Sequence, residues 1–130
     1  MDLGINGKNA LVAASSKGLG RAVAEELATE GANLVMCARS ADALDKASQE
    51  IAANTGVKVV AVPTDLTDSN AIGTLLERAQ NEIGQIDILV TNTGGPPPGP
   101  FESHSTDAWS QAVHQNLYWP VYGLLGNAKD

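Results

Sequence analysis

One short segment combines serine, lysine and glycine in an order that is typical of a phosphate-binding loop. It reads Ser15-Ser16-Lys17-Gly18-Leu19-Gly20 and lies between an apolar run, 10–14, and a helical pattern over 19–31. The two glycines let the backbone approach a ligand, and the N-terminus of the following helix offers N–H groups and a partial positive charge. This order favours a site for the pyrophosphate of a nucleotide, and an ordinary glycine-rich turn is the alternative.

Ala14 occupies the position where such a loop usually has its first glycine. If the backbone there needs a positive φ, alanine costs about 1 kcal/mol or more. A slightly different turn is the alternative. The sequence alone therefore leaves open whether this alanine weakens the binding of a cofactor.

Two cations are expected beside the same ligand. Lys17 lies in the loop, and Arg39, followed by Ser40, lies at the end of the second apolar run. An acidic residue about 20 positions past the loop would hold the ribose 2′-hydroxyl of NAD, but Asp42 already belongs to the next helical pattern. A 2′-phosphate would accept charge-assisted hydrogen bonds worth about 1.5–3 kcal/mol each. We therefore expect NADP rather than NAD, with solvated surface charges as the alternative.

The rest of the chain supplies elements that would hold these residues at one edge of a sheet. Near-continuous apolar runs suit strands that are buried on both faces, and they occur at 10–14, 34–38, 57–62 and 86–90. Helical patterns follow the first three runs and end near Gly31, Gly56 and Gly84. Right-handed crossovers then predict an α/β fold, a Rossmann-type doubly wound parallel sheet of about four strands in the order 3-2-1-4. The fourth strand would form an edge of this sheet.

Length, charge and cysteine content exclude several classes of protein. The 130 residues fit one domain, and eight Lys and Arg against fifteen Asp and Glu give a net charge of −7. This charge disfavours nucleic acid binding driven by bulk attraction.

The single cysteine, Cys37, forms no internal disulfide and is interpreted as a small buried apolar residue. No Cys/His spacing predicts a metal site. Without an apolar leader or a run long enough to cross a membrane, a cytoplasmic protein with no membrane partner is expected.

Residues 94–100 are rich in glycine and proline. They suit neither a helix nor a central strand, so a stiff connector is the main interpretation. Pro97 and Pro100 also match the P-x-x-P pattern of peptides that bind aromatic grooves, which is the weaker alternative.

The chain resembles the short-chain dehydrogenase/reductase family from about Lys8 to about Leu117. Residues 11–22 are similar to the family's T-G-x-x-x-G-x-G segment, with alanines in place of the threonine and the first glycine. Residues 64–66, which read Thr-Asp-Leu, are similar to its D-V or D-L step.

Two further segments extend the resemblance. Residues 89–94 are similar to the family's N-N-A-G segment, with Thr91 and Thr93 in place of the first asparagine and the alanine. Trp109, followed by Asn116-Leu117, is similar to its fourth helix. The four segments together identify the family through their order and spacing.

The resemblance implies a set of cofactor contacts and one catalytic residue. It implies that Asp65 contacts adenine beside the N–H of Leu66, and that Asn116 bends the fourth helix and holds a water that relays protons to a lysine. Turn or cap formation by Asp65, and a structural role for Asn116, are the alternatives. Asn92 can tie neighbouring strand ends together through its amide, and capping of a turn is the alternative. The predicted cofactor-binding residues are Ser15, Ser16, Lys17, Gly18, Leu19, Gly20, Arg39, Ser40, Asp65, Leu66, Asn92 and Gly94.

The activity implied by the resemblance is NADP(H)-dependent hydride transfer between an alcohol and a carbonyl, such as reduction of a 3-oxoacyl group or another small ketone. The family's chemistry needs a tyrosine, a lysine four residues later and a serine on a fifth strand. Neither Tyr118 nor Tyr122 is followed by such a lysine, so this chain alone is not expected to catalyse the reaction. The alternatives are a non-catalytic nucleotide-binding or partner-binding module, and a truncated product without function.

We divide the chain into an incomplete dinucleotide-binding domain, 1–117, and a divergent tail, 118–130. Pro120 and two glycines are expected to interrupt a long helix in this tail. A homo-oligomer, or a pairing with a full-length relative, is the expected macromolecular partner.

Overall fold

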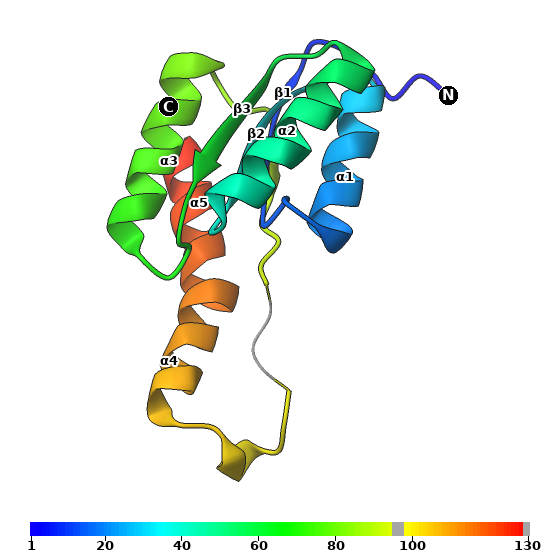
Figure 1. Cartoon of the computed structure of the whole chain (residues 1–130). Coiled ribbons are helices and arrows are strands. Elements are labelled where there is room, and N and C mark those ends of the chain that lie inside the picture. Colours follow the sequence, from blue (N-terminus) through cyan, green and yellow to red (C-terminus); the bar gives the residue numbers. More distant parts are fainter. Residues whose placement is uncertain (95–97, 129–130) are drawn as a thin grey trace.

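The computed structural model describes residues 1–94 and 98–128, which form a four-stranded parallel sheet with helices on both faces (Figure 1). The strands are β1 (Asn9–Ala13), β2 (Asn33–Ala38), β3 (Val59–Pro63) and β4 (Ile88–Val90). Their order is β3-β2-β1-β4, so the predicted doubly wound topology is confirmed and β4 lies at an edge. Within the register, Leu11 of β1 is level with Val35 of β2 and Leu89 of β4.

Two apolar layers hold the helices to the sheet. Helices α1 (Gly18–Thr29) and α2 (Ala41–Thr55) pack on one face, where Val12 and Met36 are buried. Helix α3 (Ser69–Glu82) packs on the other face, where Leu11 and Val35 are buried. Successive strand residues therefore enter opposite cores, which is why the strands read as continuous apolar runs.

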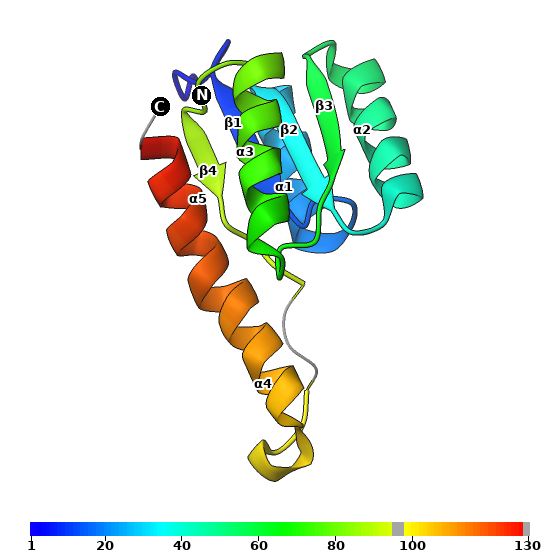
Figure 2. The ribbon, with the colours of Figure 1, turned by 90° about the vertical axis from the view of Figure 1, so that its left-hand side faces the viewer.

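The last helical segment extends well beyond the sheet (Figure 2). After a short turn, η1 (Phe101–Ser103), the chain forms α4 (Thr106–Val113), a π-helical turn η2 (His114–Tyr118) and α5 (Trp119–Ala128). These three consecutive elements are called the C-terminal helix below. In η2 the Trp119 N–H donates to the carbonyl of His114, five residues back. This wider turn ends at Tyr118, two residues before Pro120, which has no N–H to donate.

The prediction that proline and glycine interrupt this helix is wrong. Its glycines instead allow close packing, because a Cβ on Gly123 would lie 3.0 Å from Trp119 Cζ3 and one on Gly126 would lie 2.3 Å from Leu76 Cδ1. The Trp119 ring is fully buried in the same core as α3. The division of the chain after residue 117 stays a prediction, and residues 129–130 of the tail lie outside the described residues.

Three further predictions concern Cys37, membrane-spanning helices and the P-x-x-P pattern. Cys37 is buried in β2, and burial raises the pKa of its thiol to about 12, which confirms the apolar interpretation. Among the described residues, no helix is long and apolar enough to cross a membrane. Pro97 of the P-x-x-P pattern lies outside the described residues.

Candidate nucleotide-binding site

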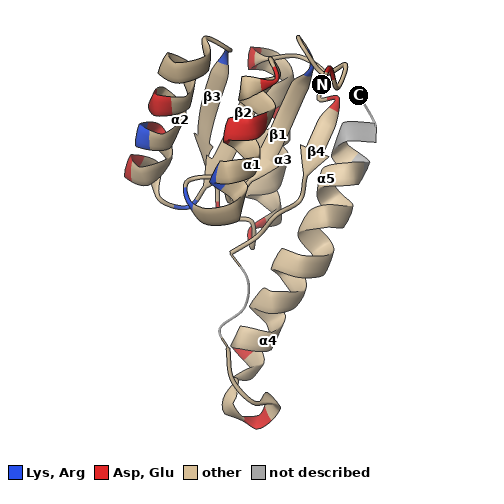
Figure 3. Ribbon diagram, turned by 90° about the vertical axis from the view of Figure 1, so that its right-hand side faces the viewer, with Lys and Arg blue, Asp and Glu red and all other residues tan. Residues whose placement is uncertain are grey.

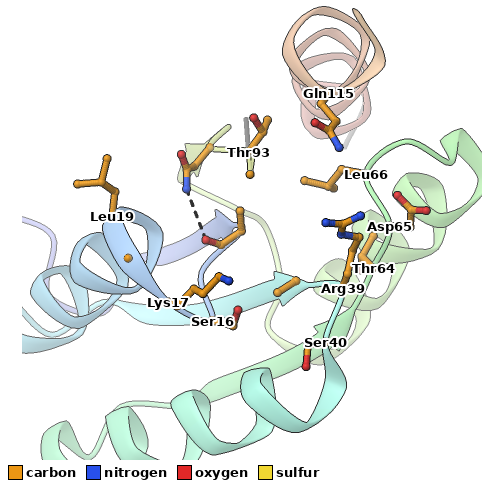
Figure 4. Close-up of a pocket in the computed structure, with 15 residues that line it drawn as sticks. Ser16, Lys17, Leu19, Arg39, Ser40, Thr64, Asp65, Leu66, Thr93 and Gln115 are labelled. Carbon is orange, nitrogen blue, oxygen red and sulfur yellow. Dashed lines mark hydrogen bonds between the residues drawn. The ribbon is translucent and has the colours of Figure 1, made fainter. Parts of the chain in front are cut away.

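A cleft of about 420 Å³ lies at the carboxyl edge of the sheet (Figure 4). It is lined by the β1–α1 loop and the start of α1, by the end of β2, by the residues that follow β2, β3 and β4, and by one residue of the C-terminal helix. The carboxyl ends of parallel strands meet at this edge, where ligands of open α/β sheets usually bind. Its lining residues are Ala14, Ser16, Lys17, Gly18, Leu19, Ala38, Arg39, Ser40, Thr64, Asp65, Leu66, Asn92, Thr93, Gly94 and Gln115.

The β1–α1 loop has the backbone of a glycine-rich turn although it begins with alanine. Ala14 has a φ of 50°, the single positive φ of a non-glycine residue in the described chain. Gly18, with a φ of 61°, has open space on the side where a Cβ would project. A Cβ on Gly20 would lie 2.1 Å from the carbonyl oxygen of Ala14, so glycine lets α1 start directly beside the loop. The loop therefore has the predicted form, with strain at its first residue.

The N-terminus of α1 differs from those of α2, α3 and α4. The hydroxyl of Ser40, the carboxylate of Asp68 and the hydroxyl of Ser105 cap those three helices. At α1 the N-cap residue is Lys17, which makes no side-chain capping bond. The first-turn N–H groups and the partial positive charge of α1 thus face the cleft without a competing side-chain oxygen.

Arg21 is not available to this cleft. Its guanidinium donates to Glu25 at 2.8 Å and to Glu50 of α2 at 2.5 Å. These bonds raise the pKa of Arg21, and the same contact lowers the pKa of Glu50. The charged residues that line the cleft are therefore Lys17, Arg39 and Asp65.

Asp65 follows β3 and is held by its own turn. Its Oδ1 accepts from the Thr67 hydroxyl at 2.7 Å and from the Thr67 N–H at 2.9 Å. These bonds, helped by the nearby positive charge of Arg39, lower the pKa of the Asp65 carboxyl. Asp65 is thus a turn residue, as the alternative interpretation proposed, while it also lines the cleft beside Arg39 (Figure 4).

Side chains at the end of β4 connect the loop to the C-terminal helix. Asn92 Nδ2 donates to the Ala14 carbonyl at 3.4 Å, which confirms the prediction that this amide ties neighbouring strand ends. The hydroxyl of Thr93 donates to Asn116 Oδ1 at 3.3 Å, and Asn116 Nδ2 donates to the Ala112 carbonyl at 2.9 Å. Asn116 therefore lies in the π-helical turn with its amide engaged on both sides.

Most of the predicted cofactor-binding residues lie around this cleft. Two of them do not line it. Ser15 is buried and its hydroxyl donates to the Val12 carbonyl, and Gly20 packs against the Ala14 carbonyl. Asn116 does not line it either, although it is bonded to Thr93, which does. The predicted set did not contain Ala38, Thr64, Thr93 and Gln115, nor Ala14, which the sequence singled out only as the first position of the loop. The first three adjoin predicted residues, but no sequence signal indicated that Gln115 faces the cleft.

The cleft suits an anionic nucleotide better than a metal. It combines two cations, a helix N-terminus and backbone with open space at Gly18, which together match phosphate groups. Leu19 and Leu66 add apolar surface for a base or sugar. In the described part of the chain, no group of three or more His, Cys, Asp or Glu could hold a metal ion.

Comparison with known sequences gives a consistent result. A sequence model of the family described as short chain dehydrogenase matches residues 8–124. The chain is 37% identical over 113 residues to the 3-oxoacyl-(acyl-carrier-protein) reductase of Haemophilus influenzae, an alignment that covers 87% of this chain and 45% of that protein. It is 38% identical over 132 residues to the glycine betaine reductase ATRR of Emericella nidulans, covering 96% of this chain and 10% of that protein.

Solved structures show the same fold. The L-sorbose reductase from Gluconobacter frateurii, complexed with NADPH and L-sorbose, superposes with a TM-score of 0.95 at 31% identity. This match covers 99% of our chain and 49% of that one. The chain thus spans about half the length, or less, of these similar proteins.

Proposed function

Because this chain belongs to the short-chain dehydrogenase family, we propose that it binds NADP in the cleft at the carboxyl edge of its sheet. The observation that carries the proposal is that Lys17 and Arg39 line one cleft in a chain whose net charge is −7. An anion with two separated phosphate groups would be attracted to both cations. The NADPH complex of the similar L-sorbose reductase supports this choice of cofactor.

The residues divide into two groups in this proposal. Lys17, the loop and the N-terminus of α1 would hold the pyrophosphate, whereas Arg39 and Ser40 would hold the 2′-phosphate. Bound NADP(H) would supply hydride transfer at its nicotinamide, for an alcohol and carbonyl pair such as a 3-oxoacyl group or another small ketone. Asn116, bonded to Thr93 at the end of β4, is our candidate for the catalytic set.

Substitution of Arg39 tests the cofactor. We expect calorimetry to show that the wild-type chain binds NADPH at least about tenfold more tightly than NADH, because the 2′-phosphate adds charge-assisted bonds. Arg39→Asp should erase or invert this preference. Arg78→Asp makes the same change of charge on α3, away from the cleft, and should leave it intact. Equal affinities of the wild-type chain for the two cofactors would contradict the proposal.

A non-catalytic nucleotide-binding module is the second candidate. It is favoured by one observation: no tyrosine in the 130 residues is followed four positions later by lysine. An unassisted phenol keeps a pKa near 10 and is a poor general base at neutral pH. The purified chain is therefore expected to reduce no member of a ketone panel with NADPH above background. Turnover that survives removal of host reductases would exclude this second candidate.

A further inference from the structure

Gln115 is the residue of the C-terminal helix that lines the nucleotide cleft. The other lining residues come from the β1–α1 loop, from the start of α1 and from the ends of β2, β3 and β4. Figure 4 shows the Gln115 side chain reaching down from this helix toward Leu66, which follows β3. The helix therefore brings one amide across the cleft to the side that carries Leu66 and Asp65.

The amide of Gln115 differs from its polar neighbours in having no partner within the described residues. The Asn116 amide is bonded to Thr93 and to the Ala112 carbonyl, and the ring of His114 contacts that of Tyr118 with centroids 4.9 Å apart. Gln115 is half-buried and makes no side-chain hydrogen bond inside residues 1–94 and 98–128. A half-buried amide that faces a cleft leaves one donor group and one acceptor oxygen for a ligand.

The surroundings of this amide fit a purine base. Leu66 is mostly buried in the core, and the part of its side chain that lines the cleft offers an apolar edge to a ring. The nearby carboxylate of Asp65 only accepts, and its Oδ1 receives two bonds from Thr67. Its Oδ2 is left as an acceptor for one hydrogen of a 6-amino group, which has a second hydrogen to donate to Gln115. A glutamine amide can pair with a 6-aminopurine through two bonds, by accepting from the amino group and donating to the adjacent ring nitrogen.

We propose that Gln115 reads the 6-aminopurine of the nucleotide through this pair of hydrogen bonds, while Leu66 supports the ring. The inference rests on the proposed function, since it assigns the base-recognition residue of the same cleft. It also gives the C-terminal helix a direct part in nucleotide binding. Gln115 lies in the π-helical turn of this helix.

A ligand-based double-mutant cycle tests this assignment by calorimetry on the full chain. The probes are adenosine 2′,5′-bisphosphate and its analogue that lacks the 6-amino group, purine riboside 2′,5′-bisphosphate. Gln115→Met keeps the length of the side chain and removes its hydrogen bonds. We expect it to weaken binding of the adenosine probe about tenfold and to change binding of the analogue less than about twofold.

Two further variants serve as an alternative to Gln115→Met and as a control outside the cleft. Gln115→Asn withdraws the amide by one methylene and should also weaken binding of the adenosine probe, which keeps the test valid if Gln115→Met is unstable. Gln111 is exposed on α4 and does not line the cleft. Gln111→Met should therefore leave the affinities for the adenosine probe and for its analogue unchanged.

The outcomes separate this inference from the proposed function. If the wild-type chain binds the adenosine probe and Gln115→Met weakens both probes equally, or neither, the assignment of Gln115 is overturned and NADP binding stands. If the wild-type chain binds neither probe nor NADPH, the proposed function fails and the inference fails with it.

Discussion

Ala14 holds a left-handed backbone conformation that costs an alanine about 1–2 kcal/mol. Its φ is 50°, and its carbonyl accepts the Asn92 amide, which helps to hold the turn. Ala14→Gly is therefore expected to raise the free energy of unfolding by about 1 kcal/mol, measured by chemical denaturation. An increase in the free energy of unfolding would be informative, because most alanine-to-glycine changes destabilise a protein.

Ala53→Gly provides the matched control. Ala53 lies exposed inside α2, where the same substitution should lower the free energy of unfolding by about 1 kcal/mol. If both glycine variants lose stability, the strain that we assign to Ala14 is wrong.

The carboxyl of Asp65 predicts a dependence of stability on pH. Its pKa is lowered mainly by the Thr67 hydroxyl and N–H. A lowered pKa in the folded chain adds stability above the unfolded pKa of about 4, and this stability disappears as pH falls through the folded value. Thr67→Val removes the hydroxyl donor, so we expect it to raise the Asp65 pKa in an NMR titration and to cost stability at pH 6.

The difference in stability between wild type and Thr67→Val should then narrow as the pH falls from about 4 to about 2. Thr74→Val removes a hydroxyl that bonds to the Asn70 carbonyl, a group that does not titrate, so its effect should not vary with pH. A constant difference for Thr67→Val would show that the hydroxyl does not act through Asp65.

The contact between α1 and the β1–α1 loop depends on the absence of a side chain at Gly20. A Cβ there would lie 2.1 Å from the Ala14 carbonyl oxygen and 2.9 Å from Asn92 Nδ2. Gly20→Ala must therefore move the helix away from the strand, and we expect a loss of about 2 kcal/mol or more. Gly73→Ala, inside α3 with nothing within 4 Å of its Cβ, should instead gain about 0.5–1 kcal/mol. A gain in both variants would contradict the close packing of α1.

Trp119 anchors the C-terminal helix to the sheet. Its ring is fully buried, and its indole Nε1 has no hydrogen-bond partner within the described residues. Trp119→Ala should lower the free energy of unfolding by about 3–5 kcal/mol because it leaves a cavity. Trp119→Phe should cost well under half of that, since it also removes the unpaired donor. Trp109→Ala, at a ring that is 45% exposed, is the control and should cost little. Equal losses for Phe and Ala at position 119 would refute this account.

The charge of the whole molecule is distributed unevenly (Figure 3). The net charge is −7, yet Asp107 is the single charged residue between positions 106 and 128. Exposed apolar side chains recur every four residues along this stretch, at Trp109, Val113, Leu117 and Val121. Such a stripe on a surface that carries almost no charge favours contact with another apolar surface.

We therefore expect the chain to self-associate. Its weight-average mass in light scattering should rise with concentration, and Leu117→Glu should reduce this rise by placing a charge in the stripe. Leu3→Glu, at an exposed leucine near the N-terminus, should leave it unchanged. A constant monomer mass over the whole concentration range would contradict this expectation.

The sequence determined the order of the elements and the edge of the sheet where the site forms. Continuous apolar runs and helical spacing are local patterns, and right-handed crossovers leave few ways to connect them. The strand order, and the positions of Lys17, Arg39 and Asp65 around one cleft, could therefore be predicted. Each of these residues lies within four positions of the end of a strand, so its place is set mainly by that strand and the short turn after it.

Features that depend on contacts between distant segments required the tertiary structure. The continuous helix past Pro120 exists because Trp119 is buried beside α3 and a π-helical turn precedes the proline, which overrides the local helix propensity. Gln115, which faces the cleft, and Asn116, which meets Thr93, both lie in this turn. The sequence showed these residues only as neighbours on one helix, because the direction of a side chain depends on how the whole helix packs against the sheet.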